Sequence, residues 1–271
     1  MPQSLRSPKI IKRRRRKFVI KLFLVFVVAF IVIGCPIFLL RGNFFKIASI
    51  EIDGNLVVSK ESLIQVANDS LIGNYFYLIP HSSIVLYPHD SIVNSIIKKF
   101  PRIESVKVKA LSTKSIRISV VERKPNALWC ETPDSKYCFF IDSTGLVFDS
   151  APSFSSDVYM VYRGILDSNP VGNYYLPTQQ FAKVQSLLEK IRALGIRPTR
   201  LEYDSSGSYK IVTHEGVFIL FSIDDNVDKI SSNLASVLND PKLNIFQNHV
   251  LSVFSIDLRY GNKVIVRKNE E

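Results

Sequence analysis

The sequence predicts an α+β protein with three parts: a single N-terminal transmembrane helix, a small β-α-α-β-β domain, and a mixed β domain with an antiparallel sheet and two helices. Three observations lead to this prediction. Residues 22–40 form an uncharged run close to the start of the chain. Alternating and helical patterns of apolar residues then follow in the order of the small domain. Beyond residue 124, short alternating segments dominate and two helical patterns interrupt them.

Composition excludes several classes of protein. The 271 residues are 46% hydrophobic and 22% charged, which is too apolar for a disordered chain. Three cysteines are too few for a scaffold built on disulfides. The net charge of +11 is concentrated, because residues 1–21 hold nine Lys or Arg and no acid, leaving 26 bases against 24 acids. The high charge therefore describes a short tail rather than the folded part.

The run at 22–40 is expected to cross a membrane. Nineteen helical residues extend about 28 Å, close to the thickness of the bilayer core. A cleaved signal peptide is the alternative, but no small-residue cleavage pattern follows the run. The basic tail at 1–21 predicts a cytoplasmic N-terminus, with residues 41–271 outside the cell membrane. The basic stretch Lys12–Lys17 could instead bind nucleic acid, but it lacks interleaved aromatics, and no nucleic-acid partner is predicted.

The first folded domain is expected over residues 44–123. A strand over 45–53 should end in the turn at Gly54, and Ser59 should cap the helix that follows. Asp90 is predicted to cap a second helix, which Pro101 ends. Two alternating strands complete the domain, at 106–108 and 116–120.

The second domain is expected over residues 124–268. One helix should run from a cap at Thr178 to a stop at Gly195, and another should end before Pro241. Strands are expected at 127–129, 137–141, 146–148, 158–162, 200–203, 209–213, 217–221, 250–259 and 263–267.

Two cysteines of this domain bracket a turn-like stretch. Cys130 and Cys138 flank residues 131–137, and an extracytoplasmic location would be oxidising. A disulfide across the hairpin and a pair of free, small strand residues both fit this pattern. Cys35 lies in the membrane run and is expected only to pack there.

Five segments together resemble the FtsQ/DivIB family of bacterial cell-division proteins. They are the strand, turn and helix start at 45–55 and 58–61, the helix-to-strand segment at 100–108, the E-R-x-P-x-A-like junction at 121–127, the I-D-x-x-G segment at 140–148, and the I-D-L-R-Y strand at 255–260 with 264–267. Their order and the N-terminal anchor make the resemblance specific. The stretch Tyr75–Pro88 matches no motif of the family.

The resemblance implies a fold and a function. Residues 44–123 would form a POTRA domain, and residues 124–268 the family's β domain. Members of the family have one membrane span, no known catalysis and no cofactor. They are scaffolds of the divisome at the division septum, and they hold the coiled-coil membrane proteins FtsB and FtsL, or DivIC-like counterparts. The POTRA domain would contact other divisome proteins.

The partner-binding site is expected at the last turn and strand. A terminal strand exposes unpaired backbone groups to which a partner strand can add, and tyrosine is a common anchor at interfaces. The predicted site consists of Tyr260, Gly261, Asn262, Lys263, Val264, Ile265 and Val266. The alternative is that Tyr260 packs on its own domain while Lys263 and Arg267 protect the edge from pairing.

The sequence offers no motif for catalysis. It has no G-x-S-x-G, H-E-x-x-H, P-loop or G-x-G-x-x-G pattern, so neither a metal nor a cofactor is predicted. His81, His89 and Asp90 lack metal-ligand spacing. The stretches 142–145 and 204–207 fit connecting turns better than protease-like loops. Two other classes remain open: a membrane-anchored envelope enzyme, and a POTRA-bearing secretion or assembly accessory.

Overall fold

The computed structural model describes residues 8–132, 137–153, 158–164, 166, 169–203, 208–247 and 250–268. The predicted turn at 204–207 and most of the turn between the two cysteines lie outside the described residues. The chain divides into two compact units, Met1–Glu122 and Arg123–Glu271. This division falls one residue before the boundary expected from the sequence.

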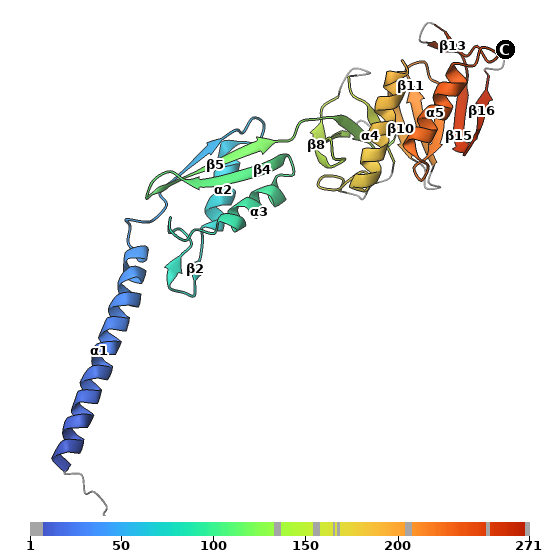
Figure 1. Cartoon of the computed structure of the whole chain (residues 1–271). Helices are drawn as coiled ribbons and strands as arrows, with labels where there is room; N and C mark the ends of the chain where they lie inside the picture. The colour runs from blue at the N-terminus through green and yellow to red at the C-terminus, as the bar shows by residue number, and fades with distance from the viewer. Residues whose placement is uncertain are drawn as a thin grey trace, which may run out of the picture. The chain divides into compact units, whose positions relative to one another are not determined.

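The N-terminal helix α1 spans Pro8–Arg41 and includes the whole apolar run (Figure 1). Its segment Arg15–Arg41 is long and apolar enough to cross a membrane. Large side chains such as Phe23, Phe30 and Phe38 are exposed along it, because none of them enters a core of the first unit. Part of the basic tail continues the same helix.

The first unit has the predicted order of elements after α1. They are β1 (Ser49–Asp53), α2 (Lys60–Ser70), α3 (His89–Lys99), β4 (Ile103–Ala110) and β5 (Ser115–Glu122). The sheet order is β1-β5-β4, with β1 parallel and β4 antiparallel to β5. Alternate strand residues, among them Ile116 and Ile118, are buried with Leu63 of α2 and Ile92 of α3 in one core. The two helices therefore cover one face of this sheet (Figure 1).

An element that the sequence did not predict lies between α2 and α3. The short strands β2 (Asn74–Tyr75) and β3 (Ile79–Pro80) form an antiparallel hairpin. This hairpin occupies much of the stretch that matched no family motif.

The predicted helix caps have mixed outcomes. Ser59 caps α2 as expected, because its side chain accepts a hydrogen bond from the Ser62 amide. Asp90 is not a cap: α3 begins at His89 with Pro88 at the N-cap, and Asp90 hydrogen-bonds the His89 ring instead. Thr178 is also not a cap, since Pro177 holds that position before α4. In both helices a proline precedes the first helical residue, so each helix starts one or two residues earlier than the polar side chain suggested.

The second unit is built on a nine-stranded sheet in the order β16-β15-β12-β11-β10-β9-β6-β7-β8. Its strands are β6 (Ala127–Cys130), β7 (Cys138–Ile141), β8 (Val147–Ala151), β9 (Val161–Arg163), β10 (Pro198–Tyr203), β11 (Ser208–Thr213), β12 (Phe218–Ser222), β15 (Ser255–Tyr260) and β16 (Lys263–Arg267). Two helices complete the unit, α4 (Thr178–Ala193) and α5 (Val227–Leu238). Gly195 follows α4 with a positive φ of 87°, which confirms the predicted stop.

The prediction of an antiparallel sheet is wrong for three strand pairs. β9 is parallel to both β6 and β10, and β12 is parallel to β15. Parallel neighbours need a long crossover, and a hairpin turn cannot connect them. Helix α4 lies between β9 and β10 in the chain, and α5 lies between β12 and β15. The two helices predicted from the sequence are therefore the crossovers of the β9–β10 and β12–β15 pairs, while in the chain β7 and β8 lie between the parallel strands β6 and β9.

The predicted strand over 250–259 is divided in two. Its start is β14 (Val250–Leu251), which pairs with β13 (Phe246–Gln247) in a separate two-stranded sheet. Its end is β15, in the large sheet. Helices α4 and α5 pack with the inward residues of the large sheet in one core, which includes Phe181, Leu234 and Ile256.

Candidate functional site

Strand β16 lies at one end of the nine-stranded sheet. It pairs with β15 in antiparallel register, and across the described ranges it has no second neighbouring strand. An edge strand presents alternate N–H and C=O groups away from its sheet. The position of the predicted binding strand, 263–267, at a sheet edge is therefore confirmed.

The side chains of β16 alternate between two faces. Val264 and Val266 pack against the core beneath the sheet. Ile265 pairs with Asp257, and with Lys263 and Arg267 it occupies the opposite face, where both cations are exposed. The edge is therefore anchored by two valines, while a partly exposed isoleucine lies between two positive charges.

The turn from β15 to β16 is held by the helix beneath it. Gly261 has a φ of 67°, in the left-handed region that favours glycine. Its carbonyl oxygen accepts a hydrogen bond of 2.7 Å from Asn233 Nδ2 on α5. Tyr260, just before the turn, is 55% exposed, so it is not packed within its own core. The Arg259 guanidinium lies 5.9 Å from the centre of its ring.

Asp257 and Arg259 fix the end of β15 that leads into this turn. The Asp257 carboxylate accepts hydrogen bonds from Arg259 Nε at 2.9 Å and from its terminal nitrogen at 2.7 Å. These bonds outweigh burial and hold the pKa of Asp257 below its ordinary value. Arg259 also donates to Ser208 Oγ on β11 at 3.2 Å. A two-pronged pair of this kind restrains the backbone next to Tyr260.

At the other end of the sheet, the edge strand β8 is covered in part by the segment at 172–174. The amide of Val147 in β8 donates to the carbonyl of Asn173 at 2.9 Å, and the Gly172 amide donates to the carbonyl of Val147 at 2.8 Å. Leu146 and Tyr174 form an isolated bridge beside them. Of the two sheet edges, β16 is therefore the more accessible to an added strand.

Cys130 and Cys138 are joined in a disulfide between β6 and β7. They are directly opposite one another in the strand register, with Cα atoms 4.5 Å apart. Close to them, Phe140 and Phe148 stack at 6.0 Å and form a small cluster apart from the main core. The bond is thus part of the packing of the end of the sheet remote from β16. Cys35 is free and exposed on α1.

The junction at 121–127 holds a buried carboxylate whose role the sequence did not reveal. Glu122 is 8% exposed, and its Oε1 accepts hydrogen bonds from the amides of Leu56, Val57 and Val58 at 2.8–2.9 Å. Arg102 Nε donates to Oε2 at 3.1 Å. Burial raises the pKa of Glu122, but the three amides and Arg102 outweigh it, so the pKa is lowered.

The next residue makes a similar contact in the second unit. Arg123 donates to Asp142 Oδ2 at 2.6 Å. The other oxygen of Asp142 accepts from the Thr144 amide, the Thr144 hydroxyl and the Leu146 amide at 2.6–3.0 Å. The stretch 142–145 is thus a structural turn, as expected from the sequence. The E-R pair could be recognised in the sequence. The groups that Glu122 and Arg123 bind could not, because they are distant in the chain.

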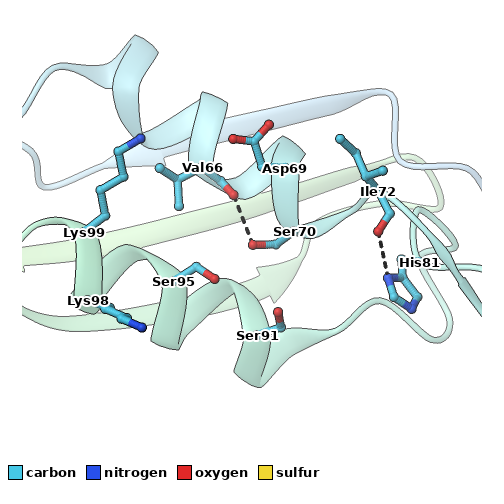
Figure 2. A pocket seen from close by; sticks show the side chains of 9 residues that line it. All are labelled: Val66, Asp69, Ser70, Ile72, His81, Ser91, Ser95, Lys98 and Lys99. Atoms are coloured by element: carbon cyan, nitrogen blue, oxygen red, sulfur yellow. Dashed lines mark hydrogen bonds between the residues drawn. The ribbon is translucent and has the colours of Figure 1, made fainter.

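A shallow hollow of about 670 Å³ lies between α2 and α3 (Figure 2). His81 Nδ1 donates to the carbonyl of Ile72 at 3.1 Å, and Ser70 donates to the carbonyl of Val66. Figure 2 draws no bond from His81 to Ser91 or Ser95, such as a nucleophile and its base would make.

Metal-ligating residues do not gather in the part of the chain that the structure describes: it contains no group of three or more His, Cys, Asp or Glu that could hold an ion. His81 and His89 are engaged with Ile72 and Asp90 respectively. His249 lies outside the described residues.

Comparison with known proteins does not assign the chain to a family. No protein-family model matches it, and no curated protein sequence matches it. The class of protein that the fold defines is an α+β protein with a long apolar N-terminal helix and mixed sheets.

Proposed function

We propose that this chain is a non-enzymatic scaffold of the bacterial divisome, similar to FtsQ/DivIB proteins. Helix α1 anchors it in the cell membrane with the N-terminus in the cytoplasm. The first unit serves as a POTRA domain, and the second unit binds FtsB/FtsL-like or DivIC-like coiled-coil proteins at the septum. The observation that carries the proposal is the accessible β16 edge beside the exposed Tyr260.

The topology of the first unit supports the POTRA assignment. Its β1-α2-α3-β4-β5 order and the sheet order β1-β5-β4 agree with the β-α-α-β-β domain that the resemblance implies. The E-R junction of the resemblance also coincides with the division between the two units, after Glu122.

The proposed mechanism is strand addition. A partner segment in extended conformation continues the sheet beyond β16, and main-chain hydrogen bonds supply much of the affinity. Tyr260 provides an aromatic anchor at the turn. Lys263 and Arg267 favour acidic side chains on the same face of the partner strand, because opposite charges stabilise cross-strand pairs.

Three carboxylates of the described residues are held by cations and are not candidates for a general acid. General acids need a raised pKa, whereas the carboxylates with shifted pKa values in the described residues, Glu122, Glu202 and Asp257, all have lowered ones. Glu202 is surrounded by Arg163, Arg200 and Lys210. Each carboxylate is therefore engaged in a structural ion pair.

The test is a titration of the full chain, in detergent or nanodiscs, with the extracytoplasmic coiled coil of the host's FtsB/FtsL-like proteins. Tyr260→Ala should weaken binding about tenfold or more, the loss typical of an interface anchor of about 1.4–2 kcal/mol. Ile265→Asp should also weaken it, because a carboxylate on that face repels the acidic partner strand.

Tyr174→Ala is the matched control. Tyr174 is 49% exposed, similar to Tyr260, but it lies beside Leu146 at the opposite end of the sheet. It should bind normally. Equal losses in Tyr174→Ala and Tyr260→Ala would reject the β16 site, and absence of saturable binding to the wild-type chain would reject the proposed function.

A further inference from the structure

The hairpin between α2 and α3 presents an aromatic tip to the outside of the molecule. The tip consists of Phe76, Tyr77 and Leu78, which connect β2 to β3. Phe76 and Tyr77 are each 90% exposed, and Leu78 is 46% exposed. No charged residue occurs anywhere from 70 to 80. Burying this surface would be favourable, so its exposure points to a missing contact.

The backbone of the tip holds the two rings outward. Phe76 and Tyr77 have φ values of 48° and 59°, and the Leu78 amide donates to the carbonyl of Tyr75 at 2.9 Å. Positive φ at both central positions is the pattern of a type I′ turn, for which Asn-Gly is preferred. Bulky aromatic residues are disfavoured in this conformation, so local turn preference does not explain their presence.

The base of the hairpin is well held. The rings of Tyr75 and His81 lie 4.3 Å apart, and the His81 amide donates to the carbonyl of Gly73 at 3.0 Å. The tip is thus an exposed apolar end on a well-bonded support. Figure 1 shows the backbone of this hairpin, labelled at β2, projecting from the first unit.

Hydrogen bonds tie the tip to the end of the membrane helix. Arg41, the last residue of α1, donates from Nε to the carbonyl of Leu78 at 2.7 Å and from a terminal nitrogen to that of Tyr77 at 2.9 Å. Arg41 directly follows the apolar run at 22–40. The tip therefore lies at the level where α1 would leave the bilayer.

The chain just beyond α1 is paired with the segment after the hairpin. Lys46 bridges to Ser83, and the Ile84 amide donates to the carbonyl of Phe45 at 2.7 Å. Phe44 and Val85, the neighbours of this bonded pair, are both exposed apolar residues. Exposed apolar surface is thus found on both segments that adjoin the end of α1.

We propose that the aromatic tip inserts into the outer interfacial region of the same membrane that α1 crosses, and that it orients the first unit against the lipid surface. Aromatic side chains favour this region, where apolar rings and polar headgroups meet. The inference rests on the anchoring role proposed for α1. Lipid is favoured over a protein partner because the tip is bonded directly to the residue that follows the membrane run.

Depth-dependent fluorescence quenching tests the inference on the full chain in phospholipid vesicles. Tyr77→Trp adds one reporter to the native Trp129, which is buried in the second unit and serves as a constant background. Lipids brominated at shallow acyl positions should quench most of the added emission, and in unbrominated vesicles insertion should shift that emission to the blue. Leu56→Trp is the matched control: Leu56 is 86% exposed in the same unit, beyond the end of β1 remote from α1, and should stay unquenched.

A second variant separates loss of insertion from loss of folding. In a Leu78→Trp background, Phe76→Asn with Tyr77→Gly installs the preferred turn residues, so the melting temperature should be unchanged while quenching of the reporter is largely lost. Vesicle flotation reports on α1 independently. A chain that floats while the Tyr77→Trp reporter stays unquenched would overturn the tip proposal and leave the anchor intact. Equal quenching of Leu56→Trp would also overturn it, and a chain that does not float would overturn both.

Discussion

Glu122 and Arg123 are neighbours in the chain, but their side chains are bound in different units. Glu122 closes the first unit by accepting three amides of the segment after β1. Arg123 enters the second unit and pairs with Asp142. The contacts of the chain therefore change from the first unit to the second between these two residues.

We expect Glu122→Gln to destabilise the first unit. The amide side chain keeps the shape but loses the charge. Its NH₂ group only donates, so either the backbone amides or Arg102 lose their acceptor. The loss in free energy of unfolding should be about 3 kcal/mol, the scale for breaking a buried charged network. Chemical denaturation followed by circular dichroism measures it. Glu104→Gln, at an exposed position of β4, should have almost no effect.

The same carboxylate predicts a pH dependence. The pKa of Glu122 is lower in the folded protein than its ordinary value of 4.5, so its contribution is complete above that pH and is lost as the pH falls through the folded-state pKa. The melting temperatures of wild type and Glu122→Gln should therefore differ by a constant amount near neutral pH and converge below about 4.5. A gap that stays constant down to pH 3 would contradict the assignment.

We expect the Cys130–Cys138 disulfide to stabilise the second unit. Its sequence separation is 8 residues, and closing a loop of that length lowers the entropy of the unfolded chain, which contributes about 2.5 kcal/mol to stability at room temperature. The double variant Cys130→Ser with Cys138→Ser should melt at a lower temperature, and a reductant should lower the wild-type value to a similar point. Cys35→Ser should respond to reductant as the wild type does.

Gly261 in the β15–β16 turn and Gly216 in the β11–β12 turn form a matched pair. Gly261→Ala and Gly216→Ala both place a side chain at positive φ, 67° and 81°, without a close steric clash. Each should cost about 1 kcal/mol of stability. If β16 binds the partner, only Gly261→Ala should also weaken that binding, which the titration proposed above would measure. Equal affinities of the two variants would argue against the turn as part of the interface.

The element order was predictable because it depends on local patterns. Ser59 as a cap, the stop at Gly195 and the terminal strand 263–267 were all expected and all confirmed. The errors were of two kinds. Asp90 and Thr178 were wrongly predicted as N-caps, because a preceding proline holds the N-cap position of each helix. The antiparallel sheet was wrong because strand direction depends on where a crossover helix returns the chain, which periodicity does not show.

The sequence by itself determined the apolar helix, the helices of the two units, most of their strands and the candidate edge strand, because hydrophobic period and turn residues act over a few positions. Only the tertiary structure decided which distant groups meet. The amides of Leu56–Val58 meet Glu122 more than sixty residues away, and Arg41 meets the carbonyls of Tyr77 and Leu78 across more than thirty-five. In each of these contacts a long side chain binds backbone groups. Because every residue has a backbone, no pattern in the sequence indicates which residues will be the partners.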